Sequence, residues 1–379
     1  MTVFRTFVSR CTAACLAVVW VLVSTPEWDA AQPVQTPKTQ KVQKKAKPKV
    51  KAKAKAKAKV VLGKALGNTQ AVKALASRLS ADHQLPKAWV QQHIAKARLL
   101  PQVQQMVLPP PSPTAKNWQA YRARFLQTQR IQAGVAFARL HEEALKSAEA
   151  RYGVPTAYVL GVLGVETFYG QHQGQFKVLD ALATLSMAFP KEHPYASERQ
   201  AFFESELGHH LKQLRTQPAL KNQLGSYAGA SGWPQFMPSS IAKFAVDFDG
   251  DGRIDLSRSP VDAIGSVAHY FQAYGWHTGM PTHFEVKVHA NEADLAALLA
   301  PDIVPTWTLS HLQDKGVAVL DASGYAKPLA LVQLFNAEEA PSYVAGTENF
   351  FVITRYNRSS YYALAVIELG QAVSLALVP

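Results

Sequence analysis

The segment Tyr158-Val-Leu-Gly-Val-Leu-Gly-Val-Glu166-Thr-Phe-Tyr-Gly170 decides the fold, and it carries one carboxylate in an otherwise apolar run. From Tyr158 to Val165 every residue is apolar or glycine, which predicts a helix buried on all sides. Pro155 suits the first turn of this helix, because a proline there gives up no helical hydrogen bond. Burial disfavours the charged form of a carboxyl group, so Glu166 is suited to act as a general acid near neutral pH. The alternative is a structural glutamate tied to a buried arginine or to backbone amides.

A second segment, residues 225–240, combines small residues, aromatic residues, a glutamine and two prolines. Small residues let a backbone approach a ligand closely. Aromatic faces suit sugar rings, and Ser226 and Gln235 offer hydrogen bonds to hydroxyl or acetamido groups. A turn without a ligand can be equally rich in glycine and proline, so this composition alone only suggests a saccharide site.

Together the two segments resemble the lytic murein transglycosylase B family of bacterial cell-wall enzymes, which has soluble and membrane-bound members. The matching stretches keep the order of the family and lie at residues 164–170, 179–186, 227–230, 235–240, 261–268 and 354–357. The resemblance implies an enzyme that cleaves the β-1,4 bond between N-acetylmuramic acid and N-acetylglucosamine in peptidoglycan without consuming water.

In that reaction Glu166 would first protonate the glycosidic oxygen and then act as base on the C6 hydroxyl of the muramoyl sugar, leaving a 1,6-anhydro end. Ordinary glycosidases need two carboxylates, but here the hydroxyl of the substrate replaces water. Two alternatives stay open. A hydrolytic muramidase would use water and release reducing ends, and a peptidoglycan-binding protein without activity would have no need of Glu166.

The resemblance also implies a set of saccharide-binding residues in the groove: Ser226, Gln235, Tyr270, Tyr356, Asn357, Tyr362 and Arg199. Without the family, each single tyrosine could equally be part of the core with a satisfied hydroxyl. The chain departs from the family pattern in two places. Trp233-Pro234 stands where Tyr-Gly is expected, and Glu198-Arg199 stands where two arginines are expected. Of the residues that the resemblance implies for contacts to the peptide stems of the substrate, only Arg199 is therefore carried over.

The stretch Asp247-Phe-Asp249-Gly-Asp251-Gly252-Arg253-Ile254-Asp255 follows the pattern of an EF-hand calcium loop. Carboxylates alternate at its first, third and fifth positions, glycine at the sixth allows the bend, and the seventh offers a backbone carbonyl. Arg258 occupies the position where a glutamate normally closes the loop, and the resemblance implies that a later aspartate does so. The expected structural Ca²⁺ ligands are Asp247, Asp249, Asp251, Arg253 and Asp262. A solvated Asp/Gly turn is the alternative, and we expect no organic cofactor.

The N-terminus indicates export. Arg5 and Arg10 precede sixteen uncharged residues, 11–26, which are short for a spanning helix of about 20 residues and typical of a secretory signal. Residues 1–31 are thus a signal peptide, or an anchor if they are not cleaved. We expect a location in the periplasm of a Gram-negative bacterium.

Residues 32–66 are predicted to be a disordered linker rich in lysine and alanine. Residues 38–64 hold twelve lysines and no acid, so the rest of the chain carries a net charge of only +1 out of +13. Mutual repulsion keeps such a segment unfolded. After export we expect no nucleic-acid partner; anionic phospholipid or lipopolysaccharide fits the charge, and a solubilising spacer is the alternative. The expected oligomeric state is a monomer.

The periodicity of the remaining chain predicts a mainly α, lysozyme-like fold. Residues 67–114 read as a helical N-terminal segment with a proline-rich link, and residues 115–379 as the catalytic domain. Helices are expected at 71–79, 88–99, 118–125, 132–152, 199–214, 241–246 and 361–375. Short strands are expected at 284–288, 316–321, 329–335 and 350–354, within a β-containing insertion at 283–352.

Overall fold

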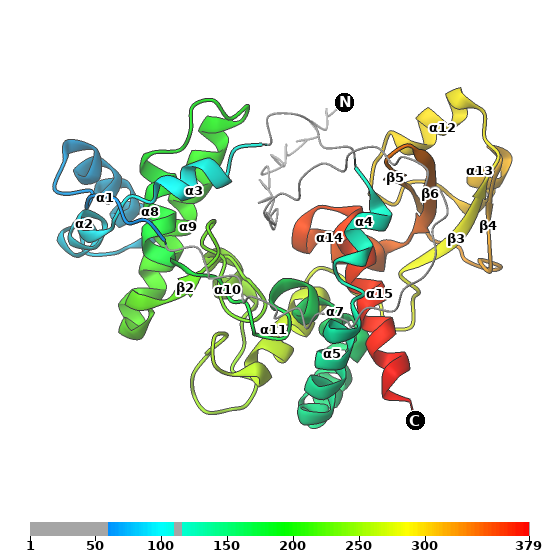
Figure 1. Ribbon diagram of the computed structural model, residues 1–379, viewed down its shortest axis with the longest axis horizontal. Coiled ribbons are helices and arrows are strands. Elements are labelled where there is room, and N and C mark those ends of the chain that lie inside the picture. Colours follow the sequence, from blue (N-terminus) through cyan, green and yellow to red (C-terminus); the bar gives the residue numbers. More distant parts are fainter. Residues whose placement is uncertain (1–59, 110–115, 379) are drawn as a thin grey trace, which may run out of the picture.

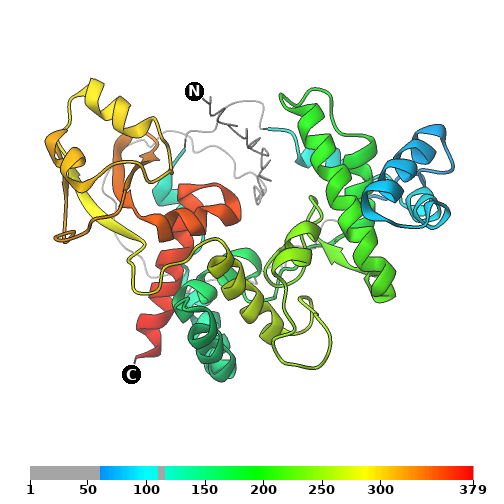
Figure 2. The same ribbon diagram turned by 180° about the vertical axis from the view of Figure 1, so that it is seen from behind.

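The structure is a computed structural model that describes residues 60–109 and 116–378. The predicted signal or anchor, and nearly all of the lysine-rich segment expected to contact anionic lipids, lie outside these residues. Figure 1 shows a mainly helical molecule with the N-terminal helices at one end and a small sheet at the other, and Figure 2 shows the same arrangement from behind. The mainly α class predicted from the sequence is confirmed.

The first lobe is a helical cluster in which the N-terminal segment shares one core with later helices. Its elements are α1 (Gln70–His83), α2 (Lys87–Lys96), α3 (Pro101–Met106), α8 (Val178–Met187) and α9 (Ala196–Thr216). The N–H of Arg98 donates to Asp180 Oδ1 at 3.0 Å, and the N–H of Leu100 donates to Thr184 Oγ1 at 3.1 Å. Residues 67–109 are therefore integral to the lobe that contains α8 and α9, which the predicted division at residue 115 did not anticipate.

The last residues of the predicted linker, 60–66, lie in the part of the chain that the structure describes. The N–H of Gly63 donates to the carbonyl of Leu99 at 2.8 Å, and that of Leu66 donates to the carbonyl of Ala97 at 2.9 Å. These backbone pairs fix residues 63–66 against the first lobe, so the linker expected to reach residue 66 is shorter at this end. The apolar residues Val60 and Leu66, which pack on the lobe, explain the difference.

The second lobe is built on a second, larger core. Its helices are α4 (Trp118–Ala123), α5 (Thr128–Leu140), α6 (Glu142–Tyr152), α7 (Thr156–Thr167), α11 (Pro260–Ala273), α14 (Glu348–Asn357) and α15 (Ser360–Leu377). The predicted helix at 132–152 is two helices, because the chain turns at His141 between α5 and α6. The remaining short elements are β1 (Phe176–Lys177), η1 (Pro218–Asn222), β2 (Leu224–Gly225) and α10 (Pro238–Phe244).

Helix α7 is buried because α15 lies directly against it (Figure 1). A Cβ atom at Gly161 would overlap the carbonyl oxygen of Val366, and one at Gly370 would overlap that of Ala157. Glycine is thus required where the two backbones meet. In the described part of the chain α15 is the one helix long and apolar enough to span a membrane, but half of its apolar window is buried in this core.

The β-containing insertion is an antiparallel sheet of four strands in the order β4-β3-β6-β5. The strands are β3 (His283–Val288), β4 (Val317–Val319), β5 (Ala330–Asn336) and β6 (Glu339–Gly346), with α12 (Glu292–Leu299) and α13 (Leu309–Asp314) alongside. The strand expected at 350–354 is wrong, since these residues lie in α14. Thr347 decides this, because its Oγ1 accepts from the N–H groups of Asn349 and Phe350 and so caps a helix.

Candidate active site

Glu166 lies in the last turn of α7, half-buried, with one side-chain hydrogen-bond partner among the described residues. The hydroxyl of Tyr362, from the start of α15, donates to Glu166 Oε1 at 2.7 Å. Burial raises the pKa of Glu166 to about 7, and the hydrogen bond from Tyr362 opposes that rise. A carboxyl group with this pKa can give and take a proton at neutral pH.

A group of tyrosines from distant parts of the chain surrounds Glu166. The rings of Tyr356 and Tyr362 are stacked, with centroids 5.9 Å apart and planes at 16°, and Tyr270 lies 4.8 Å from Tyr356. Burial and then the charge of Glu166 raise the pKa values of Tyr121, Tyr356 and Tyr362. The structure therefore brings three sequence-predicted tyrosines together at the acid and adds Tyr121, which no motif had marked.

Hydrogen bonds to its backbone carbonyls hold the loop at 225–240 against α7 and α14. Thr167 Oγ1 donates to the carbonyl of Trp233 at 2.9 Å and accepts from the N–H of Gly170 at 3.0 Å. The hydroxyl of Tyr356 donates to the next carbonyl, that of Pro234, at 2.6 Å. The Trp233-Pro234 pair is thus held from α7 and α14 at once.

Trp233 itself packs inward. Its ring lies 5.5 Å from that of Phe137, and a Cβ at Gly170 would come within 2.6 Å of it. The ring of Trp233, which stands where the family pattern has tyrosine, therefore fills space next to the end of α7.

The other predicted groove residues are placed as follows. Ser226 Oγ accepts from the N–H groups of Ala228 and Ala230 at 3.2 and 3.1 Å, which shapes the turn. Gln235 has a left-handed φ of 49°, and its Nε2 donates to the carbonyl of Gly232 at 2.9 Å. Asn357 ends α14 directly after Tyr356. Ser226, Gln235 and Asn357 are all half-buried, so part of each faces solvent.

Arg199 lies in the first lobe, on α9. Its guanidinium stands 5.6 Å from the ring centre of Phe203, and burial lowers its pKa while the nearby Tyr227 raises it. Phe203 and Tyr227 belong to the core of the first lobe, whereas the tyrosine cluster around Glu166 packs in the second.

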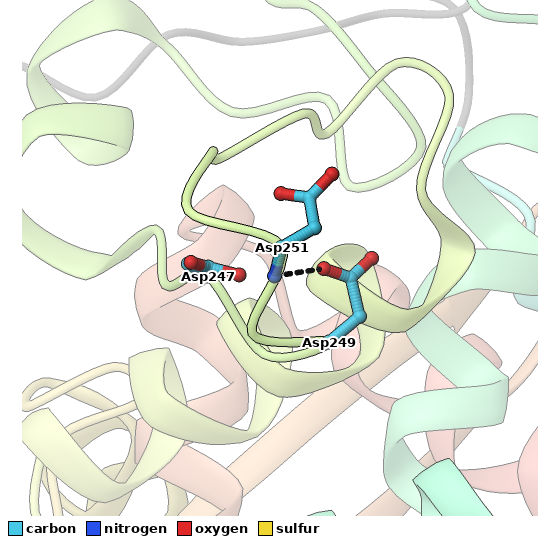
Figure 3. A group of neighbouring side chains, drawn as sticks. All are labelled: Asp247, Asp249 and Asp251. Atoms are coloured by element: carbon cyan, nitrogen blue, oxygen red, sulfur yellow. Dashed lines mark hydrogen bonds between the residues drawn. The ribbon is translucent and has the colours of Figure 1, made fainter.

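The predicted calcium loop joins α10 to α11 (Figure 3). The carboxylates of Asp247, Asp249 and Asp251 each place an oxygen within 4.8 Å of the others. Gly250 and Gly252, with φ values of 75° and 87°, allow the tight bends, and their N–H groups donate to Asp247 at 2.8 Å. Three acidic oxygens at this spacing suit a hard cation such as Ca²⁺.

The remaining predicted ligands have different positions. Asp262 is buried, and its oxygens accept from the N–H groups of Phe248 and Asp255, both at 2.8 Å. The N–H of Arg253 donates to Asp251 Oδ1 at 2.8 Å. Asp262 thus supports the loop through hydrogen bonds to its backbone, and the cluster of three aspartates does not include it.

Comparison with known proteins agrees with this geometry. Residues 67–371 match the family model described as the transglycosylase SLT domain. The chain is 37% identical over 326 residues to the membrane-bound lytic murein transglycosylase B of Escherichia coli (strain K12), covering 84% of this chain and 86% of that protein. The chain belongs to the lytic murein transglycosylase B family. Its lysozyme-like fold class is confirmed with that assignment.

Two solved structures of relatives bear on the site. The Escherichia coli lytic transglycosylase SLT35 in complex with calcium has a TM-score of 0.70 and 34% identity, over 83% of this chain and 97% of that one. SltB3 from Pseudomonas aeruginosa in complex with NAG-anhNAM-pentapeptide has a TM-score of 0.65 and 29% identity, over 81% of this chain and 80% of that one.

Proposed function

We propose that this family member cleaves the MurNAc-β-1,4-GlcNAc bond of peptidoglycan without water, and that Glu166 acts first as acid and then as base. The half-buried Glu166 with its single donor, Tyr362, carries the proposal. At a pKa of about 7, a large fraction of Glu166 is protonated at neutral pH and can protonate the glycosidic oxygen.

The second half of the reaction uses the same carboxylate. As the bond from C1 to the leaving oxygen breaks, Glu166 becomes charged, and the hydroxyl of Tyr362 donates to that charge at 2.7 Å. The carboxylate then takes the proton of the C6 hydroxyl while O6 bonds to C1, which closes the 1,6-anhydro ring and restores the acid. Neither step consumes water. The product bound to the SltB3 relative contains an anhydro sugar, which supports this outcome.

The surroundings of Glu166 favour this reaction over hydrolysis. Among the described residues, burial and Tyr362 account for its pKa, and no second carboxylate contributes. A hydrolase of the ordinary kind places a second carboxylate across the scissile bond. The groove roles of Ser226, Gln235, Asn357 and Arg199 are part of the same proposal.

For the loop at 247–255 we propose a structural Ca²⁺. The clustered oxygens of Asp247, Asp249 and Asp251 fit such an ion, with the carbonyl of Arg253 as a further ligand, while Asp262 supports the loop through its hydrogen bonds to backbone N–H groups. The ion would cancel the repulsion of the aspartates and stiffen the link between α10 and α11. The calcium complex of SLT35 supports this choice of ion.

The cellular context is likewise proposed: a monomer in the periplasm, acting on glycan strands, with the lysine-rich segment on an anionic membrane or lipopolysaccharide. The membrane-bound relative supports a location at the cell envelope.

Mass spectrometry of sugars released from purified sacculi by the wild type and by Glu166→Gln tests the function. We expect anhydro-ended fragments from the wild type only. Reducing ends, heavier by one water, would identify a hydrolase. Release of no sugar, with calcium present, would favour a binding protein without activity.

A further inference from the structure

The chain directly after Glu166 adopts an unusual conformation. Helix α7 ends at Thr167, and the next three residues, Phe168, Tyr169 and Gly170, have φ values of 52°, 53° and 79°. Glycine adopts this left-handed region freely, but a bulky residue there costs about 1–3 kcal/mol. Tyr169 is buried against Phe137, so core packing accounts for it.

Core packing does not account for Phe168, whose side chain is only half-buried. The guanidinium of Arg130 lies 4.5 Å from the ring centre of Phe168, and the exposed ring of His172 lies 6.0 Å away with its plane at 19°. Arg130 is fixed by a hydrogen bond to the carbonyl of Gly164 at 2.5 Å, and the N–H of His172 donates to Thr167 at 2.9 Å. Two near-parallel rings are thus anchored at the end of the helix that carries the acid.

The pair is continuous with the tyrosine cluster. Arg130 also lies 5.3 Å from the ring centre of Phe125, and Phe125 lies 5.2 Å from Tyr121. Burial and then the charge of Glu166 raise the pKa of Tyr121, as they do the pKa values of Tyr356 and Tyr362. A chain of contacts therefore links Tyr121 through the buried Phe125 and Arg130 to Phe168 and His172.

We propose that Phe168 and His172 form a further saccharide subsite, which stacks one pyranose ring of the glycan strand outside the two sugars at the cleaved bond; this rests on the proposed function. The C–H face of a sugar packs on aromatic faces, and the exposed amide of Gln171 is available for its hydroxyl groups. Binding energy from such a remote ring helps to position the reacting sugars.

The variant Phe168→Gly separates this role from a structural one. It removes the packing of a half-buried ring but also the left-handed strain, and these effects oppose each other, so we expect little change in Tm. Affinity for peptide-free murein glycan strands should fall about fivefold, the worth of one aromatic stacking contact. Affinity for the GlcNAc-MurNAc disaccharide should not change, because it does not reach the subsite. His172→Ala should give a smaller loss of the same kind.

The binding is measured by calorimetry in a Glu166→Gln background, where no cleavage occurs. A matched control is Gln84→Gly, which relieves the same strain at the end of α1, where φ is 55°, far along the chain from the acid. It should leave both affinities unchanged. Unchanged strand affinity in Phe168→Gly would overturn the subsite, as would a fall in Tm with equal losses for strand and disaccharide. The two proposals can fail independently, because the subsite is tested by binding and the proposed function by the sugars released. A wild type that releases no anhydro sugar would refute the proposed function without changing the binding result for Phe168→Gly.

Discussion

Replacing Glu166 by glutamine should make the protein more stable at high pH and leave its stability nearly unchanged at low pH. Burial raises the pKa of Glu166 from 4.5 to about 7. Between these values the native state holds a proton that the unfolded state has lost, so stability falls as the pH rises through this window and stays lower above it. Glutamine has no charge to desolvate and avoids this loss.

The size of the effect follows from the same two values. A change in pKa from 4.5 to about 7 corresponds to about 3 kcal/mol, at about 1.4 kcal/mol per pH unit. Since Glu166 keeps part of its surface exposed to solvent, screening reduces the expected gain to about 1–2 kcal/mol. That gain is a rise in Tm of a few degrees for a chain of this size.

The assay is thermal or urea unfolding of both proteins at about pH 4 and about pH 8. The same substitution at the exposed Glu143 on α6 is the control for the loss of one surface carboxylate. If Glu166→Gln shifted Tm equally at the two pH values, Glu166 would not be an acid with a raised pKa, and the mechanism drawn from it would fail.

Three further predictions concern the partners of the site. Tyr362→Phe removes a donor to the charged carboxylate, so the pKa of Glu166 should rise above about 7, by about one unit; a pH profile of kcat/KM that did not move toward higher pH would contradict this. Thr167→Val leaves the carbonyl of Trp233 without its donor and should cost about 1–3 kcal/mol, measured by urea unfolding, with Thr167→Ser restoring most of the loss. Asp249→Asn should weaken calcium binding at least about tenfold, measured by calorimetry. If calcium still raised the Tm of this variant as it does that of the wild type, the proposed site would be contradicted.

The sequence anticipated the parts of the site that depend on composition. A single acid in an apolar run predicts a buried helix, and α7 is that helix. Tyr270, Tyr356 and Tyr362 could be grouped with it through the family resemblance. Tyr121 could not, because nothing near it in the sequence marks it, and its proximity to Glu166 arises only when α4 packs on α15.

Where prediction failed, tertiary contacts or caps outweighed the local pattern. Residues 350–354 are aromatic or β-branched, as strand residues often are, but Thr347 caps them as a helix. Strand β6 begins with Glu339-Ala-Pro-Ser, which has no strand pattern of its own, and it exists because β5 and β3 pair with it on both sides. The break between α5 and α6 at His141 could not be predicted either, since histidine is compatible with a helix interior.

The hydrogen bond between Glu166 and Tyr362 joins residues 196 positions apart, and this has a consequence for biosynthesis. A ribosome must translate the chain through α15 before Glu166 receives its partner and α7 receives the helix that covers it. A chain truncated before residue 360 would expose the apolar face of α7 and lack the donor that stabilises the carboxylate. Competence to cut the cell wall is therefore among the last properties that a newly made molecule acquires.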